Sequence, residues 1–441
     1  MSVPAGKDKF MAMPPQSAAA LPWLADAKVL ANDKAGPWVQ ALRATGAETF
    51  SRHGLPSPGQ ENWQYTNLRP LAAQQFSYAQ DPVKFDAAKL PAPLIDGGYR
   101  IVLVNGQFQE KLSTVPEHVT VTSLMDAATH RLAAVEDYIV RVGDLAEAPF
   151  VALNSAYLRD GFVLQVAPHK DVAAPVEVLF YSLGGDAAIH PRVVYQIGQN
   201  AGLTVLERHM GEGVYFANSY VSVGQEKDSR FKLFRFMEEA ETAWHFSQTA
   251  VSQGRSSTFE GFSLATGART AREEFRLQLL DTSISASIGG TYLMRGQQSH
   301  DFTILADHFE PDGTSVQHFK GVIDDQARAI FQGKIHVRRT AQKTDGYQSH
   351  HAILLSDRAE ASAKPELEIY ADDVKCSHGA TAGQLDAEAL FYLRSRGIPA
   401  AEARSLIIES FLNEAIEKVS NETVREFYRA RISKWLAGRA A

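Results

Sequence analysis

Short runs of alternating apolar and polar residues dominate the chain from residue 96 to about 375. Examples are YRIVLVNG (99–106), GLTVLERHM (202–210) and ARAIFQGKIHVRR (327–339). Such alternation is typical of β-strands, and the Gly, Asn, Asp and Ser residues that separate the runs are typical of turns. The pattern therefore predicts a long β region, interrupted by one possible helix near 125–141.

This β region is too long for one ordinary sandwich, because it holds about 280 residues of short strands spaced roughly 10 to 15 residues apart. A β-solenoid fits better, since each coil buries its inward side chains against its neighbours and the core grows in one dimension. Helices at both ends would then cap the core. Two stacked sandwiches or a double-sheet barrel stay open as alternatives, because no strict repeat is visible in the sequence.

Helical spacing replaces alternation at both ends of the chain. Trp38 and Leu42 lie one helical turn apart near the N-terminus, and Asp386 precedes a helical run that Gly397 ends. The fold class that we expect is mainly β, a solenoid core flanked by N- and C-terminal helical domains. The expected parts are an N-terminal helical region at 1–95, the β core at 96–379 and a C-terminal helical domain at 380–441.

The helix expected after Pro399 carries an unusually wide apolar face. Two adjacent i, i+4 stripes form it: Ala403, Ile407, Phe411, Ala415 and Val419, and beside them Ile408, Leu412 and Ile416. Such a face either covers the end of the β region or docks a partner protein. The residues alone leave both interpretations open.

Composition narrows the class of protein. The 441 residues are 45% hydrophobic and 22% charged, with a net charge of −7, which fits a globular protein. The acidic balance and the lack of a dense Lys/Arg run argue against nucleic acid as a partner. No run of about 18 apolar residues and no signal-peptide core occurs, so we expect no membrane partner and a cytoplasmic location.

The most suggestive chemistry lies at Cys376, the only cysteine of the chain, and His378. At i and i+2 of a strand, a thiol and an imidazole project from the same side. Both are metal ligands, but an iron–sulfur cluster normally needs four ligands. The pair is therefore at most a half-site that borrows ligands from another chain. The alternative is a buried cysteine beside a hydrogen-bonded histidine.

Other candidate motifs are weaker. His350 and His351 are adjacent, so on a strand they point to opposite faces and cannot readily share one metal. The run ADHFEPDGTSVQH (306–318) could hold a metal in a loop, although a polar turn between strands is the better explanation. No P-loop, GxSxG elbow or HExxH motif occurs, and no pattern pairs two carboxylates as a glycosidase requires.

The stretch from 344 to 398 closely resembles the SufB and SufD family of iron–sulfur cluster assembly proteins. Its strongest block is PELEIYADDVKCSHGAT, preceded by FQGKIHV and AQKTDGYQ, and ENWQYTNLRPL near residue 60 is similar to a segment of the same family. The resemblance runs from about residue 60 to the C-terminus. SufB members typically carry several cysteines, so the single Cys376 is more similar to the SufD branch.

The resemblance implies a right-handed parallel β-helix and a scaffold subunit without catalytic activity. It implies two partners, a SufB-like subunit paired side by side with the β-helix and the SufC ATPase, which docks on the C-terminal helical domain. In this chain the docking residues would be Leu406, Ile407, Phe411 and Leu412. His378, and with it Cys376, would lie at the SufB–SufD interface as iron or cluster ligands.

The same resemblance implies no cofactor in the isolated chain and a transient iron or iron–sulfur cluster at the partner interface. It also allows a homodimer of the isolated chain. Two alternatives from other classes are a stand-alone iron-binding protein and a β-helix carbohydrate-active enzyme. The first would bind metal as a single chain, and the second would need a groove lined with carboxylates and aromatic rings.

Overall fold

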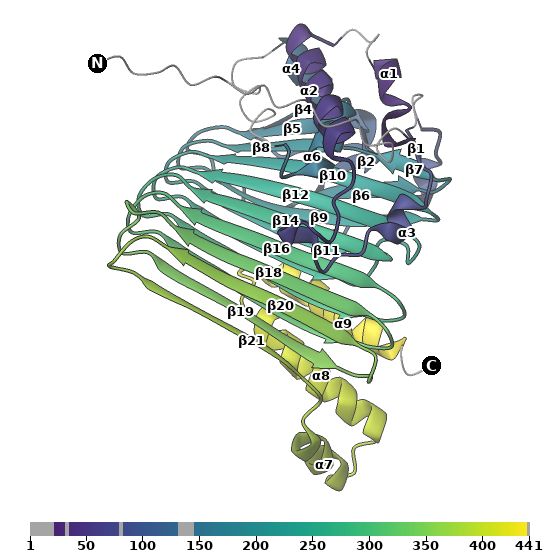
Figure 1. Cartoon of the computed structure of the whole chain (residues 1–441), viewed down its shortest axis with the longest axis vertical. Coiled ribbons are helices and arrows are strands. Elements are labelled where there is room, and N and C mark those ends of the chain that lie inside the picture. The colour runs from purple at the N-terminus through teal and green to yellow at the C-terminus, as the bar shows by residue number, and fades with distance from the viewer. Residues whose placement is uncertain (1–21, 31–34, 79–82, 131–144, 439–441) are drawn as a thin grey trace, which may run out of the picture.

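A computed structural model describes residues 22–30, 35–78, 83–130 and 145–438, and from residue 192 onward successive strands of the chain go alternately to two long sheets (Figure 1). The first sheet runs in the order β20 (Glu360–Ile369), β18 (Arg328–Val337), β16 (Ser299–His308), β14 (Thr270–Leu279), β12 (Trp244–Gln253), β10 (Tyr215–Gln225), β8 (Arg192–Ile197), β5 (Gly161–Val166) and β4 (Val119–Ser123), with β7 (Ala187–Ile189) and β1 (Ser77–Tyr78) beside it. The second runs in the order β21 (Lys375–Gly383), β19 (Asp345–Leu354), β17 (Thr314–Ile323), β15 (Ser285–Met294), β13 (Thr258–Ala265), β11 (Arg230–Met237), β9 (Gly202–Glu212), β6 (Val176–Leu183), β2 (Tyr99–Val104) and β3 (Gln107–Phe108).

The pairing is parallel from β5 to β21, so the predicted parallel β-solenoid flanked by helices is confirmed. Stacked sandwiches and a barrel are excluded, because from β8 onward each strand pairs in parallel with the strand two places later in the chain. Residues on the same line of the inner face stack coil over coil. Val223, Val251, Leu277 and Ala306 are successive partners in register, and all four are buried in the central core.

Turns between the two sheets explain the Asn, Asp and Ser residues at the joints. Each of the six turns that lead from β8, β10, β12, β14, β16 and β18 to the next second-sheet strand has one residue with a positive φ, between 53° and 60°. Asn, Asp and Ser have short polar side chains, and Asn and Asp in particular tolerate this left-handed conformation. The residues are Asn200, Asp228, Ser256, Ser283, Asp312 and Lys343.

The N-terminal segment crosses the outer face of the first sheet. Trp63 ends the short helix η2 (Glu61–Trp63) and is buried, with the guanidinium of Arg272 4.0 Å from its ring centre. The backbone carbonyl of Asn62 accepts a hydrogen bond from Arg272, and Glu61 pairs with Lys364. The ENWQYTNLRPL segment is therefore a strap across the strands.

Helices occur at both ends of the chain, and none of those described is both long and apolar enough to cross a membrane. The expected helix near 125–141 is described only in its first part, because 131–144 lie outside the described residues. N-terminal to the first coils lie η1 (Pro22–Leu24), α1 (Ala27–Leu30), α2 (Pro37–His53), α3 (Arg69–Ala72), η3 (Ala87–Lys89), η4 (Glu110–Leu112), α4 (Leu124–His130) and α6 (Pro149–Ala156).

The C-terminal helices α8 (Ala400–Ile416) and α9 (Glu422–Ala437) pack on the outer face of the second sheet (Figure 1). Outward side chains of its strands, such as Phe234, Phe262 and Val322, join Leu412 and Tyr428 in one buried cluster. The apolar stripe of α8 thus covers the side of the solenoid rather than its end. In the last coil, β20 is consequently mostly half-buried and β21 largely exposed, and neither strand has a buried residue.

Candidate functional site

Cys376 and His378 lie on β21, the last strand of the second sheet. They pair in register with Gly346 and Gln348 of β19, which are buried on the inner face of the solenoid. Both ligand candidates therefore project from the same side of β21, as their i, i+2 spacing predicts. No described coil follows, so Cys376 is only partly buried and His378 is exposed at the open end.

The Cys376 thiol is held in its protonated form. Partial burial raises its pKa, and the nearby carboxylate of Asp345 adds to this effect, although a hydrogen bond from the Gly346 backbone amide opposes it. A thiol with a raised pKa is a poor nucleophile at neutral pH. Binding to iron would therefore release a proton from Cys376.

The described residues offer no complete ligand set around this pair. Among them, the one group that brings three His, Cys, Asp or Glu ligand atoms within 4.8 Å of one another is His209, Glu239 and His245, in earlier coils of the chain. The preceding Asp373 takes part in a turn, where its backbone amide donates to the side chain of Gln342. Cys376 and His378 can thus supply at most two ligands to a metal ion or cluster.

His350 and His351 point to opposite faces of β19, as expected for adjacent strand residues. His350 is buried inside the solenoid, where its ring stacks on Phe331 with centroids 5.0 Å apart. His351 faces outward, and its Nδ1 lies 2.7 Å from the hydroxyl of Thr381. They do not share a site.

The His and Asp residues of the 306–318 run are dispersed. Asp307 is paired with Arg338 at 2.8 Å, and Nε2 of His308 lies 2.8 Å from the hydroxyl of Ser315. His318 belongs to the next strand, β17, where it lies near a different serine. The run is a polar turn between strands, which is the simpler of its two interpretations.

Of the four residues predicted to bind a partner, three are at least partly exposed and one is fully buried. Leu406 is 41% exposed, and Ile407 and Phe411 are half-buried. All three line an open groove of about 740 Å³ between α8, α7 (Ala387–Ser395) and the ends of β19 and β21. Leu412 is fully buried against the second sheet, so its side chain holds α8 in place from below.

Sequence reasoning missed the aromatic residues of α7. The Asp386 side chain caps this helix, but none of its residues is buried, and Phe391 and Tyr392 are 74% and 57% exposed. The signal was present in the run LFYL, because large apolar residues on every side of a nine-residue helix cannot all face one core. Tyr392 lines the groove together with Leu406, whereas Phe391 is exposed on the same helix and is not among the lining residues.

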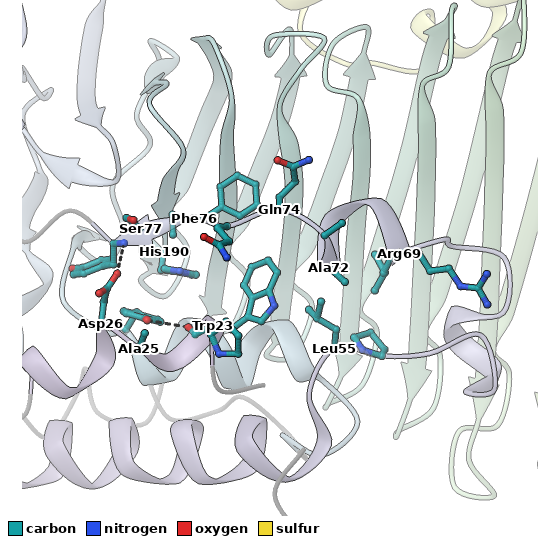
Figure 2. A pocket seen from close by; sticks show the side chains of 18 of the residues that line it. Trp23, Ala25, Asp26, Leu55, Arg69, Ala72, Gln74, Phe76, Ser77 and His190 are labelled. Atoms are coloured by element: carbon teal, nitrogen blue, oxygen red, sulfur yellow. Dashed lines mark hydrogen bonds between the residues drawn. The ribbon is translucent and has the colours of Figure 1, made fainter. Parts of the chain in front are cut away.

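A separate pocket of about 780 Å³ lies beside the N-terminal strap (Figure 2). His190 stacks on Tyr157 with centroids 4.7 Å apart, and burial lowers the pKa of His190 to about 3, so its ring is neutral. Asp26, the one carboxylate among the described lining residues, accepts a hydrogen bond from the Tyr78 backbone amide at 2.9 Å. Since most glycosidases need two carboxylates, this pocket gives the carbohydrate-active alternative no support.

Comparison with known proteins covers nearly the whole of the chain. Residues 180–411 match the family described as "SUF system FeS cluster assembly, SufBD core domain", and residues 23–178 match the "SufBD protein N-terminal region". An iron–sulfur cluster assembly SufBD family protein of Synechocystis is 29% identical over 86% of this chain and 86% of its own length. The iron–sulfur cluster assembly protein SufD of Escherichia coli is 29% identical over 88% and 91%, and a chloroplastic protein of Arabidopsis thaliana named ABCI7 is 28% identical over 89% and 85%.

Proposed function

This chain belongs to the SufB/SufD family and is a component of the SUF iron–sulfur cluster assembly system, and from that premise we propose that it serves as a SufD-type scaffold subunit. In this proposal it pairs with a SufB-like subunit, docks a SufC-like ATPase and performs no catalysis of its own. The nascent cluster is cargo built between two chains. In this proposal the protein functions in the cytoplasm, whose reducing conditions keep the Cys376 thiol free.

The observation that carries the proposal is the half-site on β21. Cys376 and His378 stand on the inner face of the last described coil, with no third ligand nearby in the described part of the chain. The edge of β21 away from β19 is unpaired among the described strands, and an unpaired edge is a template for another strand. A second solenoid set against this end would supply both the missing ligands and the missing cover.

The proposed SufC surface is the groove between α7 and α8. Leu406, Ile407 and Phe411 would contact the ATPase directly, together with Phe391 and Tyr392 of α7. Leu412 would act indirectly, because it fixes α8 on the sheet. Aromatic residues that stand exposed around a concave apolar surface are typical anchors of protein interfaces.

The two surfaces suggest how ATP could act on the cluster site. The groove is lined by Thr381 and Gly383 of β21 as well as by α7 and α8, so the docking surface and the ligand strand are one continuous structure. ATP binding would bring two SufC copies together and shift the docked helices. That movement would open the interface at His378, and a histidine suits a ligand that must later release its cluster.

The first test is anaerobic co-expression with SufB-like and SufC-like subunits, followed by the mass and the iron content of the purified assembly. We expect His378→Ala to lose the cluster and to keep the complex. His351→Ala is the matched control, because it removes a neighbouring histidine that faces outward. Loss of the complex itself in His378→Ala would sink the ligand role.

A second test separates the docking surface from folding. Deleting 385–441 would uncover Phe234 and Phe262, so point variants are more informative than truncation. Phe391→Ser should weaken SufC retention and leave SufB pairing intact, because α7 contributes no buried residue. Full SufC retention by a combined Phe391→Ser and Leu406→Ser variant would refute the proposed surface.

The stand-alone iron-binding alternative predicts a cluster on the single chain, whereas the scaffold proposal predicts none without a SufB-like partner. A chain that ignores both partners would reopen that alternative. A homodimer of the isolated chain fits either function, because β21 of one copy can pair with β21 of another.

A further inference from the structure

We propose that His209, Glu239 and His245 form an intrachain site for one divalent transition-metal ion of the Zn²⁺ or Fe²⁺ class, buried inside the solenoid. The site would be structural and independent of the half-site at Cys376 and His378. It lies between the end of β9, the turn after β11 and the start of β12. Its three side chains are 2%, 4% and 0% exposed.

The first argument is that buried side-chain atoms of Glu239 and His245 come together without forming hydrogen bonds. Oε2 of Glu239 and Nδ1 of His245 lie 2.8 Å apart, but neither makes a hydrogen bond to a described residue, and Nε2 of His245 also has none. Buried polar atoms without partners are rare and call for an explanation. Ligand atoms converge in this way when they share an ion, since bonds of about 2.0 to 2.2 Å place tetrahedral ligands roughly 3.3 Å from one another.

The second argument is the fixed position of the side chains. The two imidazole rings are perpendicular, with an interplanar angle of 86° and centroids 5.0 Å apart, and the His209 ring is stacked on Phe180 at 4.2 Å. Oε2 of Glu207 lies 3.5 Å from Nε2 of His209. A carboxylate beside a ligating histidine commonly orients its ring, so His209 is already positioned.

The turn that carries Glu239 is equally constrained. The backbone amide of Glu238 donates to the His209 carbonyl at 2.9 Å, while its side chain is held outward by Arg208 at 2.7 Å. Glu239 is consequently directed inward. Gly267 packs against its backbone so closely that an added Cβ would lie 2.3 Å from the Glu239 nitrogen and oxygen.

The third argument is charge. Beside the site, Arg235 forms buried ion pairs with Glu207 at 2.7 Å and Glu273 at 2.9 Å. With Glu239 this region holds three buried carboxylates and one guanidinium, and its other basic groups are the imidazoles of His245, 2.8 Å from Glu239, and of His209, 3.5 Å from Glu207; with both rings neutral, as metal ligands must be, two negative charges remain. Uncompensated buried charge is costly, and a divalent cation would neutralise it. Two imidazoles and a carboxylate, without a thiolate, suit Zn²⁺ or Fe²⁺ rather than an iron–sulfur cluster.

The test uses the full chain, produced alone in cells grown with added Co²⁺, which gives a visible spectrum with nitrogen and oxygen ligands. Total Zn, Fe and Co per chain is measured by mass spectrometry after native treatment with EDTA. We expect one ion per chain that resists EDTA, because the site is closed. His245→Gln and Glu239→Gln should each lower that content by about tenfold or more.

Two histidine variants serve as controls. His308→Gln changes a buried histidine elsewhere in the solenoid, and His378→Ala changes the half-site, and both should keep the EDTA-resistant ion. Since Glu239→Gln is isosteric, its circular dichroism distinguishes loss of metal from loss of fold. A wild-type chain without bound metal, or unchanged metal content in both ligand variants, would overturn the inference. Metal lost only in His378→Ala would also overturn it and would place all metal binding at the half-site.

Discussion

Leu412 and Leu406 lie on the same helix, but replacing each with alanine should affect different properties of the protein. Leu412 is fully buried between α8 and the second sheet, whereas Leu406 is 41% exposed beside the groove. We expect Leu412→Ala to loosen α8 and α9 from the sheet. We expect Leu406→Ala to leave them in place and to weaken only the binding of a partner at the groove.

The expected loss of stability follows from the buried carbon atoms that each substitution removes and from the cavity that it leaves. Leu→Ala removes three carbon atoms, which at ~0.8 kcal/mol each gives about 2.4 kcal/mol for a fully buried side chain. A residual cavity of about 50 Å³ adds roughly 1 kcal/mol at ~24 cal/mol per Å³. Leu412→Ala should therefore cost about 3 to 4 kcal/mol. Leu406 would lose about 1 kcal/mol, since part of its surface already faces solvent and no closed cavity forms.

Hydrogen exchange measured by mass spectrometry reports on these helices directly, without assuming that the long solenoid unfolds in one step. In Leu412→Ala the amides of α8 and α9 should exchange about 300-fold faster than in the wild type if the two helices open together, while the central strands stay protected. Leu406→Ala should change exchange less than tenfold. Equal protection in the two variants would refute the assignment of Leu412 to the interior and Leu406 to the surface.

Three further outcomes are expected. Burial lowers the pKa of His308 from 6.5 to about 4, so the contribution of its neutral ring to stability is complete above pH 6.5 and is lost as the pH falls toward 4. His308→Gln should therefore flatten the dependence of the unfolding free energy on pH by up to about 1.4 kcal/mol per pH unit. An unchanged pH dependence in urea titrations would contradict this. Asn421→Ala removes the cap that accepts the Val424 amide at 3.1 Å and should cost about 1 kcal/mol in the same titration, so an effect near zero would count against the cap. Gly321→Ala would place a Cβ 1.9 Å from the Tyr292 ring. This overpacking should cost about 1 to 3 kcal/mol of stability and lower the melting temperature. A melting temperature equal to that of the wild type would show that the ring moves freely.

Strand positions and the shared face of Cys376 and His378 could be predicted because they depend on local rules. Alternation in GLTVLERHM marks most of β9, and the i, i+2 spacing of Cys376 and His378 places them on one face. The solenoid was harder to distinguish from sandwiches, because its coils differ in length. Thr270 pairs with Trp244, 26 residues earlier, but with Ser299, 29 residues later, so no strict repeat survives in the sequence.

The buried metal-binding group could not be predicted, because its members come from three segments. His209 lies 36 residues before His245, and Glu239 lies in a turn that only the stacking of coils brings alongside. The stripe of α8 was recognisable from its period, but a period does not say which surface it meets. The outward side chains of the second sheet, such as Phe234, made that choice.

The packing of α9 on the second sheet also has a consequence for synthesis on the ribosome. The hydroxyl of Tyr428 donates to the carbonyl of Arg235, which is 193 residues earlier in the chain. At about 5 to 20 residues per second, roughly 10 to 40 s pass between the emergence of β11 and of its covering helix. During that interval the outward rings of Phe234 and Phe262 are not covered by α9. The growing chain therefore exposes an aggregation-prone apolar surface, which chaperones must shield until α9 is synthesised.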